Sequence, residues 1–197
     1  MGRPRSSTRL HPGALRRHGR ELQRNVLARP GVHAFVLVLD HLKAGFNVPK
    51  ILRSAEAFGA REVHLVGIGP FDPAPAKGAM RKVPLRQHQD FAPCAAALGE
   101  AGYTLCALTA DGAEPLPGAA LDRLSAFIVG HEETGLSFDP GAFPGMRTLA
   151  IPCYGQTRSL NVTVAASLAM YEYVRQHGLR PGPGRPPAGD APGGGAE

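Results

Sequence analysis

Residues 33–40 read His-Ala-Phe-Val-Leu-Val-Leu-Asp, and this short apolar run indicates the fold class. A strand of a parallel sheet is covered on both faces, so it is apolar along its length instead of alternating with polar residues. A helix is predicted next, from about Val48 to Phe58, with Asn47 as its N-cap. Pro49 lies in its first turn and Gly59 takes the place of a C-terminal glycine. The run therefore predicts a buried strand followed by a helix.

The same alternation continues along the chain. Further strands are predicted at 62–66, 103–108, 126–129 and 148–151, and further helices at 91–101 and 161–176. The Gly- and Pro-rich stretch 67–78 is predicted to be a loop. Strands that alternate with helices predict an α/β fold, a mostly parallel sheet with helices on both faces.

Charge and composition divide the chain into three parts. Residues 1–30 carry eight arginines and one acid, a net charge of +7, whereas the remainder of the chain sums to −1. We predict a basic N-terminal arm at 1–30, which either contacts nucleic-acid phosphates or serves only as a solvated tail. Eleven of the nineteen residues at 179–197 are Gly or Pro, which predicts a disordered tail. The folded domain is therefore expected at 31–178.

Several classes of protein are disfavoured by the composition. No uncharged apolar run approaches the ~20 residues that a membrane span needs, and the N-terminus lacks the apolar core of a secretory signal. Cys94, Cys106 and Cys153 are an odd number at wide spacing, which argues against a disulfide framework and favours a cytoplasmic location. No Cys-x-x-Cys or His-x-x-x-His pair occurs, so no metal is expected.

A dinucleotide-binding loop is a weak alternative. Gly67-Ile68-Gly69 follows a predicted strand, but Pro70 comes next and Asp72 stands where the third glycine belongs. The chain has no Walker phosphate loop and no Gly-x-Ser-x-Gly nucleophile elbow, so acyl transfer is disfavoured too.

Three other polar segments each follow a predicted strand. The first segment runs from Asn47 to Arg53, and Arg53 projects away from the apolar stripe of its helix. Arg53 is either a functional residue or a solvated arginine paired with Glu56. The second, residues 130–136, has two glycines that let the backbone approach a ligand closely, unless it is an ordinary polar turn. The third, residues 151–161, ends in Ser159 and Asn161, either of which could simply cap the last helix.

Taken together, the three segments resemble the three ordered motifs of the SpoU/TrmH RNA 2′-O-ribose methyltransferases, within the SPOUT superfamily. The matching residues are Asn47…Arg53-Ser54-Ala55-Glu56-Ala57-Phe58-Gly59, then Val129-Gly130-His131-Glu132…Gly135-Leu136-Ser137, then Ile151-Pro152…Ser159-Leu160-Asn161-Val162. The resemblance covers about residues 31–176, and its third motif is the most specific. His131 departs from the family's pattern, in which this position is most often Asn.

The resemblance implies methylation of a ribose 2′-hydroxyl in tRNA or ribosomal RNA with S-adenosyl-L-methionine. It also implies a C-terminal trefoil knot and a homodimer. By the same resemblance, the catalytic residues are Arg53, Ser159, Asn161, Glu132 and Asn47. The implied cofactor-binding residues are Val129, Gly130, His131, Gly135, Ile151, Pro152, Ser159 and Leu160. The alternative is a non-catalytic RNA-binding protein on the same fold, although such a protein would be expected to have lost some of the motif residues.

The last predicted helix points to a partner independently. Between Val162 and Tyr171 it carries no charge, and its apolar residues lie on all sides. A helix of this kind is buried in its own core or in an interface. We therefore predict a homodimer through helix 161–176, with a central helix of the monomer as the alternative.

Overall fold

The computed structural model describes residues 10–156 and 159–178, and its strands form one sheet. The sheet has seven strands in the order β3-β2-β1-β6-β4-β7-β5, and every neighbouring pair is parallel. The strands are β1 (Val36–Asp40), β2 (Glu62–Val66), β3 (Leu85–His88), β4 (Thr104–Leu108), β5 (Glu114–Pro115), β6 (Ser125–Val129) and β7 (Arg147–Ala150). The predicted parallel α/β sheet is confirmed.

The centre of the sheet is the pair β1 and β6, in which every residue is buried. The two strands run in register from Val36 beside Ala126 to Leu39 beside Val129. Burial on both faces explains why each strand is a continuous apolar run. Because the strands are parallel, the segments that follow them emerge at the same edge of the sheet.

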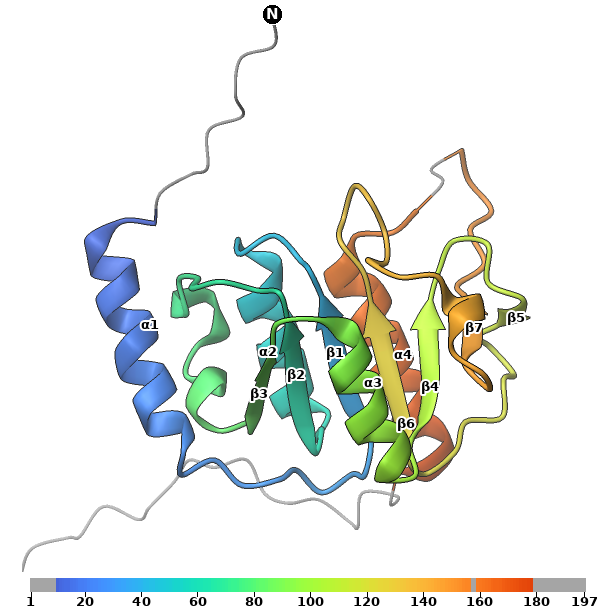
Figure 1. The fold of residues 1–197 in the computed structure, drawn as a ribbon, viewed down its shortest axis with the longest axis horizontal. Coiled ribbons are helices and arrows are strands. Elements are labelled where there is room, and N and C mark those ends of the chain that lie inside the picture. Colours follow the sequence, from blue (N-terminus) through green and yellow to red (C-terminus); the bar gives the residue numbers. More distant parts are fainter. Residues whose placement is uncertain (1–9, 157–158, 179–197) are drawn as a thin grey trace, which may run out of the picture.

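Helices cover both faces of this sheet, as predicted (Figure 1). The helices are α1 (Pro12–Asn25), α2 (Asn47–Ala57), α3 (Phe91–Glu100) and α4 (Val162–His177), with the short 3₁₀ helices η1 (Ala74–Ala76), η2 (Ala79–Arg81) and η3 (Pro140–Ala142). Ile51 of α2 and Met170 of α4 belong to one buried apolar cluster. Phe91 and Leu98 of α3 belong to a second cluster. The sheet therefore separates two cores.

Several elements lie where the sequence predicted none. The prediction omitted α1, β3 and β5, and the stretch 67–78, predicted as a loop, contains η1. No residue of β3 is fully buried, and β5 has only two residues. Neither strand forms the apolar run that marks a buried strand, so periodicity could not reveal them.

The start of α2 corrects one prediction. Phe46 occupies the N-cap position without a side-chain cap bond, and Asn47 is the first helical residue. The prediction that Asn47 caps this helix is therefore wrong. Gly59, with φ of +66°, ends the turn after the helix in the left-handed conformation expected of a C-terminal glycine.

The described part of the basic arm forms helix α1, which packs at the β3 edge of the sheet (Figure 1). The imidazole of His18 packs edge-on against Phe71, with ring centroids 4.8 Å apart. The amide of Asn25 donates to the carbonyl oxygens of Met80 and Val83 at 2.6 and 2.7 Å. Residues 1–9 and the predicted tail at 179–197 lie outside the described residues.

Helix α4 is buried on one face only. Ala166, Ala169 and Met170 are fully buried against the sheet. On the other face, Val164 is 46% exposed and Tyr171 is 58% exposed. The all-round apolar character of this helix therefore has two causes, because one face serves the core and the other remains on the surface of the chain.

Among the described helices, none combines the length and the apolar character that crossing a lipid bilayer requires.

Candidate active site

A cavity of about 1190 Å³ opens at the carboxyl ends of β4, β6 and β7. Open α/β sheets bind ligands at this edge. All eight residues predicted to bind a cofactor line the cavity, namely Val129, Gly130, His131, Gly135, Ile151, Pro152, Ser159 and Leu160. The structure thus brings the second and third polar segments together around one space.

A second, smaller cavity of about 410 Å³ lies at the opposite edge, where Gly31, His33 and Gly59 contribute to its wall. Its charged lining residues include Glu56 and Lys82, which pair with each other at 2.9 Å. Because this edge holds the amino ends of the strands, the larger cavity is the better candidate for an active site.

Glycines shape the loop after β6. The amide of His131 donates to the carbonyl of Gly135 at 2.8 Å, and the amide of Gly135 donates back to the carbonyl of His131 at 2.9 Å. A Cβ atom on Gly130 would lie 2.5 Å from the carbonyl carbon of Gly135, and Gly135 itself has a φ of +74°. The tight loop therefore requires glycine at both positions.

The imidazole of His131 stabilises the same loop. Its Nδ1 atom accepts from the backbone amides of Glu133 and Thr134, at 3.1 and 3.3 Å. These bonds assign the proton of the neutral ring to Nε2. An asparagine side-chain oxygen makes the same type of local bond in an Asx turn, so histidine at this position preserves the loop.

Asn47 joins all three polar segments. Its Nδ2 atom donates to Oε1 of Glu132 at 2.8 Å, and its Oδ1 atom accepts from Oγ1 of Thr163 at 3.2 Å. Nδ2 of Asn161 lies 3.5 Å from the same Oδ1 atom. A residue at the start of α2 is therefore hydrogen-bonded both to the loop after β6 and to the start of α4.

Glu132 is held as a carboxylate. Partial burial on its own would raise its pKa, but the hydrogen bond from Asn47 and backbone amide donors, including that of Lys43, lower the pKa overall. Glu132 also lines the cavity, so its negative charge faces the space where a ligand would lie.

Two residues at the start of α4 face the same space. Asn161 caps α4, because its Oδ1 atom accepts from the amide of Thr163 at 2.8 Å. The capping role proposed as an alternative is therefore real, and Asn161 lines the cavity as well. Ser159 lines the cavity and makes no hydrogen bond to the described part of the chain, which leaves its hydroxyl available.

Arg53 lies apart from the cavity lining. It is exposed on α2 and, within residues 10–156 and 159–178, its side chain makes no hydrogen bond or ion pair. Glu56, its suggested partner, pairs with Lys82. The neighbouring Ser54 lies 3.1 Å from Ser167 of α4, hydroxyl to hydroxyl, so Arg53 stands beside the contact between the two helices.

Asp40 is a positioning residue that sequence analysis missed. Its side chain is fully buried at the end of β1, where it accepts from the amide of Ser137 at 2.6 Å and from its hydroxyl at 2.8 Å. Nδ1 of His41 lies 2.7 Å from the same carboxylate. The available signal was a carboxylate as the last residue of a buried apolar strand, since such charges are rarely buried without partners.

The dinucleotide-loop alternative finds no support in this geometry. Gly67 and Gly69 do not line the large cavity. A Cβ atom on Gly67, whose φ is +62°, would overlap the imidazole of His41. The glycine at position 67 therefore serves packing.

Comparison with known proteins agrees with this arrangement. The model of the SpoU rRNA Methylase family matches residues 34–171. The 23S rRNA (guanosine-2′-O-)-methyltransferase RlmB of Nitrosomonas europaea is 32% identical over 77% of this chain and 60% of its own length. The chain spans less than two thirds of the length of the first curated relatives that it matches.

Two solved structures share the fold. The SpoU methyltransferase AviRb from Streptomyces viridochromogenes in complex with AdoMet has a TM-score of 0.62 and 25% identity, covering 79% of this chain and 61% of that one. A second structure, solved for insights into the 2-OH methylation of C/U34 on tRNA, has a TM-score of 0.64 and 30% identity. The match covers 74% of this chain and 97% of that one. The motifs, the parallel sheet and these matches lead to one conclusion: the chain belongs to the SpoU rRNA methylase family.

Proposed function

We propose that this chain methylates a ribose 2′-hydroxyl in RNA, with S-adenosyl-L-methionine as the methyl donor. The observation that carries the proposal is the network around Asn47, which contacts Glu132 of the second motif and Asn161 of the third beside one large cavity. RNA 2′-O-methylation is also the activity in the name of the Nitrosomonas relative. Transfer of labelled methyl groups to tRNA or to ribosomal RNA transcripts decides which of the two is the substrate.

The cavity fits a nucleoside-bearing cofactor. Ligand sites of about 300–1,000 Å³ hold drug-sized molecules, and about 1190 Å³ leaves room for a second group beside one. Leu108, Val129 and Ile151 supply apolar wall, and the glycine loop brings backbone close to a ligand. When bound, S-adenosylmethionine supplies a methyl group already activated on a sulfonium centre.

The residues of this chain would then position the hydroxyl and manage its proton. The 2′-hydroxyl is a poor nucleophile that must lose its proton as it attacks, and alignment with the methyl group removes much of the barrier. Glu132, Ser159 and Asn161 line the cavity and offer the polar atoms that would orient the ribose and the cofactor. Asn47 holds Glu132 in place.

Arg53 would stabilise negative charge in this scheme. A guanidinium is almost never neutral, so it serves better as a partner for the developing alkoxide and the adjacent phosphate than as a proton acceptor. Its lack of partners within the described residues leaves it available for a phosphate. Because it stands outside the cavity lining, the RNA would approach from the α2 side.

A homodimer through α4 belongs to the same proposal. Val164, Leu168 and Tyr171 are exposed by 46%, 38% and 58%, and their spacing places them on one face of the helix. Exposed apolar side chains that gather on one face are characteristic of an interaction surface. A second copy of the chain would cover it.

The basic arm would contribute to RNA binding through α1. Arg16 and Arg20 are exposed one turn apart, whereas Arg17 pairs with Asp72 at 2.9 Å. Replacing Arg16 and Arg20 together with glutamine should flatten the salt dependence of RNA binding by about 0.7–0.9 per lost phosphate contact. An unchanged slope would leave the arm as a solvated tail.

We place the protein in the cytoplasm. Cys94, Cys106 and Cys153 are all free thiols in the structure, which suits a reducing compartment.

The direct test uses the full chain with labelled S-adenosylmethionine and either tRNA or ribosomal RNA transcripts, followed by mapping of 2′-O-methyl groups. We expect label in one RNA class at a single ribose. RNA binding without transfer to either class would favour the alternative, a non-catalytic RNA-binding protein on this fold.

A further inference from the structure

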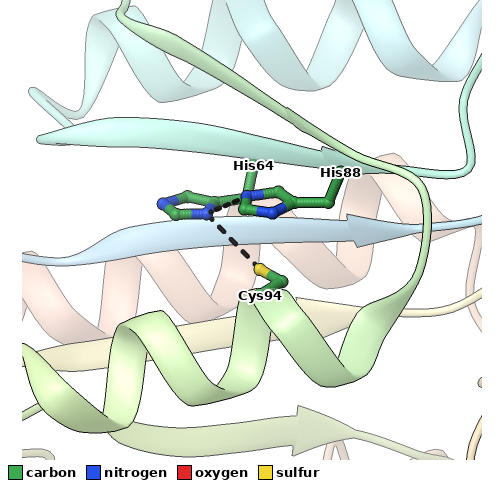
Figure 2. Close-up of side chains that lie close together, drawn as sticks. All are labelled: His64, His88 and Cys94. Atoms are coloured by element: carbon green, nitrogen blue, oxygen red, sulfur yellow. Dashed lines mark hydrogen bonds between the residues drawn. The ribbon is translucent and has the colours of Figure 1, made fainter.

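Three potential metal ligands meet on the face of the sheet that α3 covers, outside the cavity (Figure 2). His64 comes from β2, His88 ends β3 and Cys94 lies on α3. Nδ1 of His64 lies 3.0 Å from Nε2 of His88 and 3.4 Å from Sγ of Cys94. The three ligand atoms all lie within 4.8 Å of one another, and they are the one such group found among the described residues.

The two distances from Nδ1 of His64 are close to those in a tetrahedral metal centre. Bond lengths of about 2.0–2.1 Å to nitrogen and about 2.3 Å to sulfur place two nitrogen ligands about 3.3 Å apart. The same bond lengths place a nitrogen and a sulfur about 3.6 Å apart. The two distances from Nδ1 of His64 are therefore within a few tenths of an ångström of those that a bound ion would set.

The side chains around the cluster also have the arrangement of a metal site. Nε2 of His64 lies 3.1 Å from Oε1 of Glu62, so the ring donates its proton to that carboxylate and turns the lone pair of Nδ1 toward the cluster. The other oxygen of Glu62 accepts from Arg86 at 3.2 Å. A carboxylate that orients a ligating histidine through its second nitrogen is the usual outer partner of a bound zinc ion.

Burial argues against a reactive thiol at this place. Cys94 is fully buried beneath α3. Structural cysteines that are buried in this way are inert as nucleophiles. His64 is only 4% exposed, so the cluster offers no open surface to a large substrate.

We propose that His64, His88 and Cys94 bind a divalent transition-metal ion of the zinc class, with water at the fourth position and with the thiol proton of Cys94 released to solvent as the metal–sulfur bond forms. Two imidazoles and a thiolate suit Zn²⁺ and Co²⁺ and disfavour Mg²⁺ and Ca²⁺, which prefer oxygen ligands. The ion would join the two strands at the β3 edge of the sheet to α3. None of its ligands lines the large cavity, so the site is structural and separate from the proposed methyl transfer.

The spacing of these residues explains why the sequence predicted no metal. His64 and His88 are 24 residues apart, and Cys94 follows at a spacing that matches no common ligand motif. Parallel strands β2 and β3 and the helix after them bring the three residues together.

Cobalt and zinc titration of the full chain tests the site. After removal of metal with a chelator, Co²⁺ should bind at one ion per chain with a thiolate charge-transfer band in the near ultraviolet. Zn²⁺ should displace it and raise the melting temperature. His88→Gln and Cys94→Ser should each weaken binding by more than the ~10–100-fold typical of an outer partner, whereas Glu62→Gln should fall within that range.

Matched controls separate this site from other thiols. Cys106→Ser removes another buried cysteine and Cys153→Ser an exposed one, and both should keep the full cobalt spectrum. His88→Gln changes a partly exposed side chain, so it answers the question even if Cys94→Ser does not fold. Wild-type protein without the cobalt band, or a band retained in His88→Gln, would overturn the proposal and leave the cluster as a hydrogen-bonded chain.

Discussion

The cavity at the carboxyl ends of the strands and the cluster under α3 both gather polar side chains from distant segments, but they do so differently. Around the cavity, glycine loops and exposed side chains leave Ser159 and Glu132 facing open space. In the cluster, His64 and Cys94 are buried and face each other. The first arrangement is open to a ligand from solvent, whereas the second is closed to a large ligand. Burial thus separates two sites that residue types alone would not.

The largest effect is expected from the variant that tests whether Arg53, on the exposed face of α2, takes part in catalysis. Arg53→Ala should reduce methyl transfer by at least about 10²-fold, the usual scale for a positioned catalytic group. Affinity for S-adenosylmethionine should be nearly unchanged, because Arg53 does not line the cavity. Single-turnover kinetics and calorimetry measure the two quantities. Lys50→Ala, which removes another exposed cation of α2, is the control, and a full rate in Arg53→Ala would reduce Arg53 to a solvated residue.

The glycine loop after β6 provides the second test, because the open cavity depends on glycines and the buried cluster does not. Gly130→Ala should lower the free energy of unfolding by about 1–3 kcal/mol, the usual range for overpacking, because the new methyl group meets the backbone of Gly135. Cofactor affinity should fall with the distortion of the loop. Gly155 also lines the cavity, but a Cβ atom there would meet nothing within 4 Å. The Gly155→Ala variant should therefore bind S-adenosylmethionine with normal affinity. Equal affinities in the two variants would show that the loop does not hold the cofactor.

The exposed face of α4 provides the third test. Leu168→Asp should convert a dimer to monomers, because it places a charge in the proposed apolar interface. Sedimentation velocity at micromolar concentration measures the change. A wild-type protein that sediments as a monomer would contradict the proposed interface.

The smallest effect is expected at His131. His131→Asn should keep methyl transfer within a few-fold, because the amide oxygen can accept the same two backbone bonds as Nδ1. His131→Ala removes the acceptor and should reduce activity more. If both variants lost activity equally, the imidazole would have a role beyond holding the loop.

Much of the fold could be predicted from periodicity. The apolar runs of β1 and β6 marked the central strands, and the strand and helix boundaries from 62 onward agree within a few residues where elements were predicted. Helix α1 escaped because it is rich in arginine, and it is held by contacts such as that of His18 with Phe71, 53 residues away. Long-range packing of this kind leaves no local pattern.

The candidate site divides in the same way. The sequence alone determined the family motifs, and with them the residues that line the cavity, because strand ends followed by glycine and polar residues are local features. Only the tertiary structure decided that Asn47 bridges the motifs instead of capping its helix, that Asp40 anchors the second loop, and that His64, His88 and Cys94 meet. The physical reason is that hydrogen-bond partners and metal ligands are selected by distance in space. In a parallel sheet, that distance is set by strand order, which puts β1 beside β6 although 84 residues separate the end of one from the start of the other.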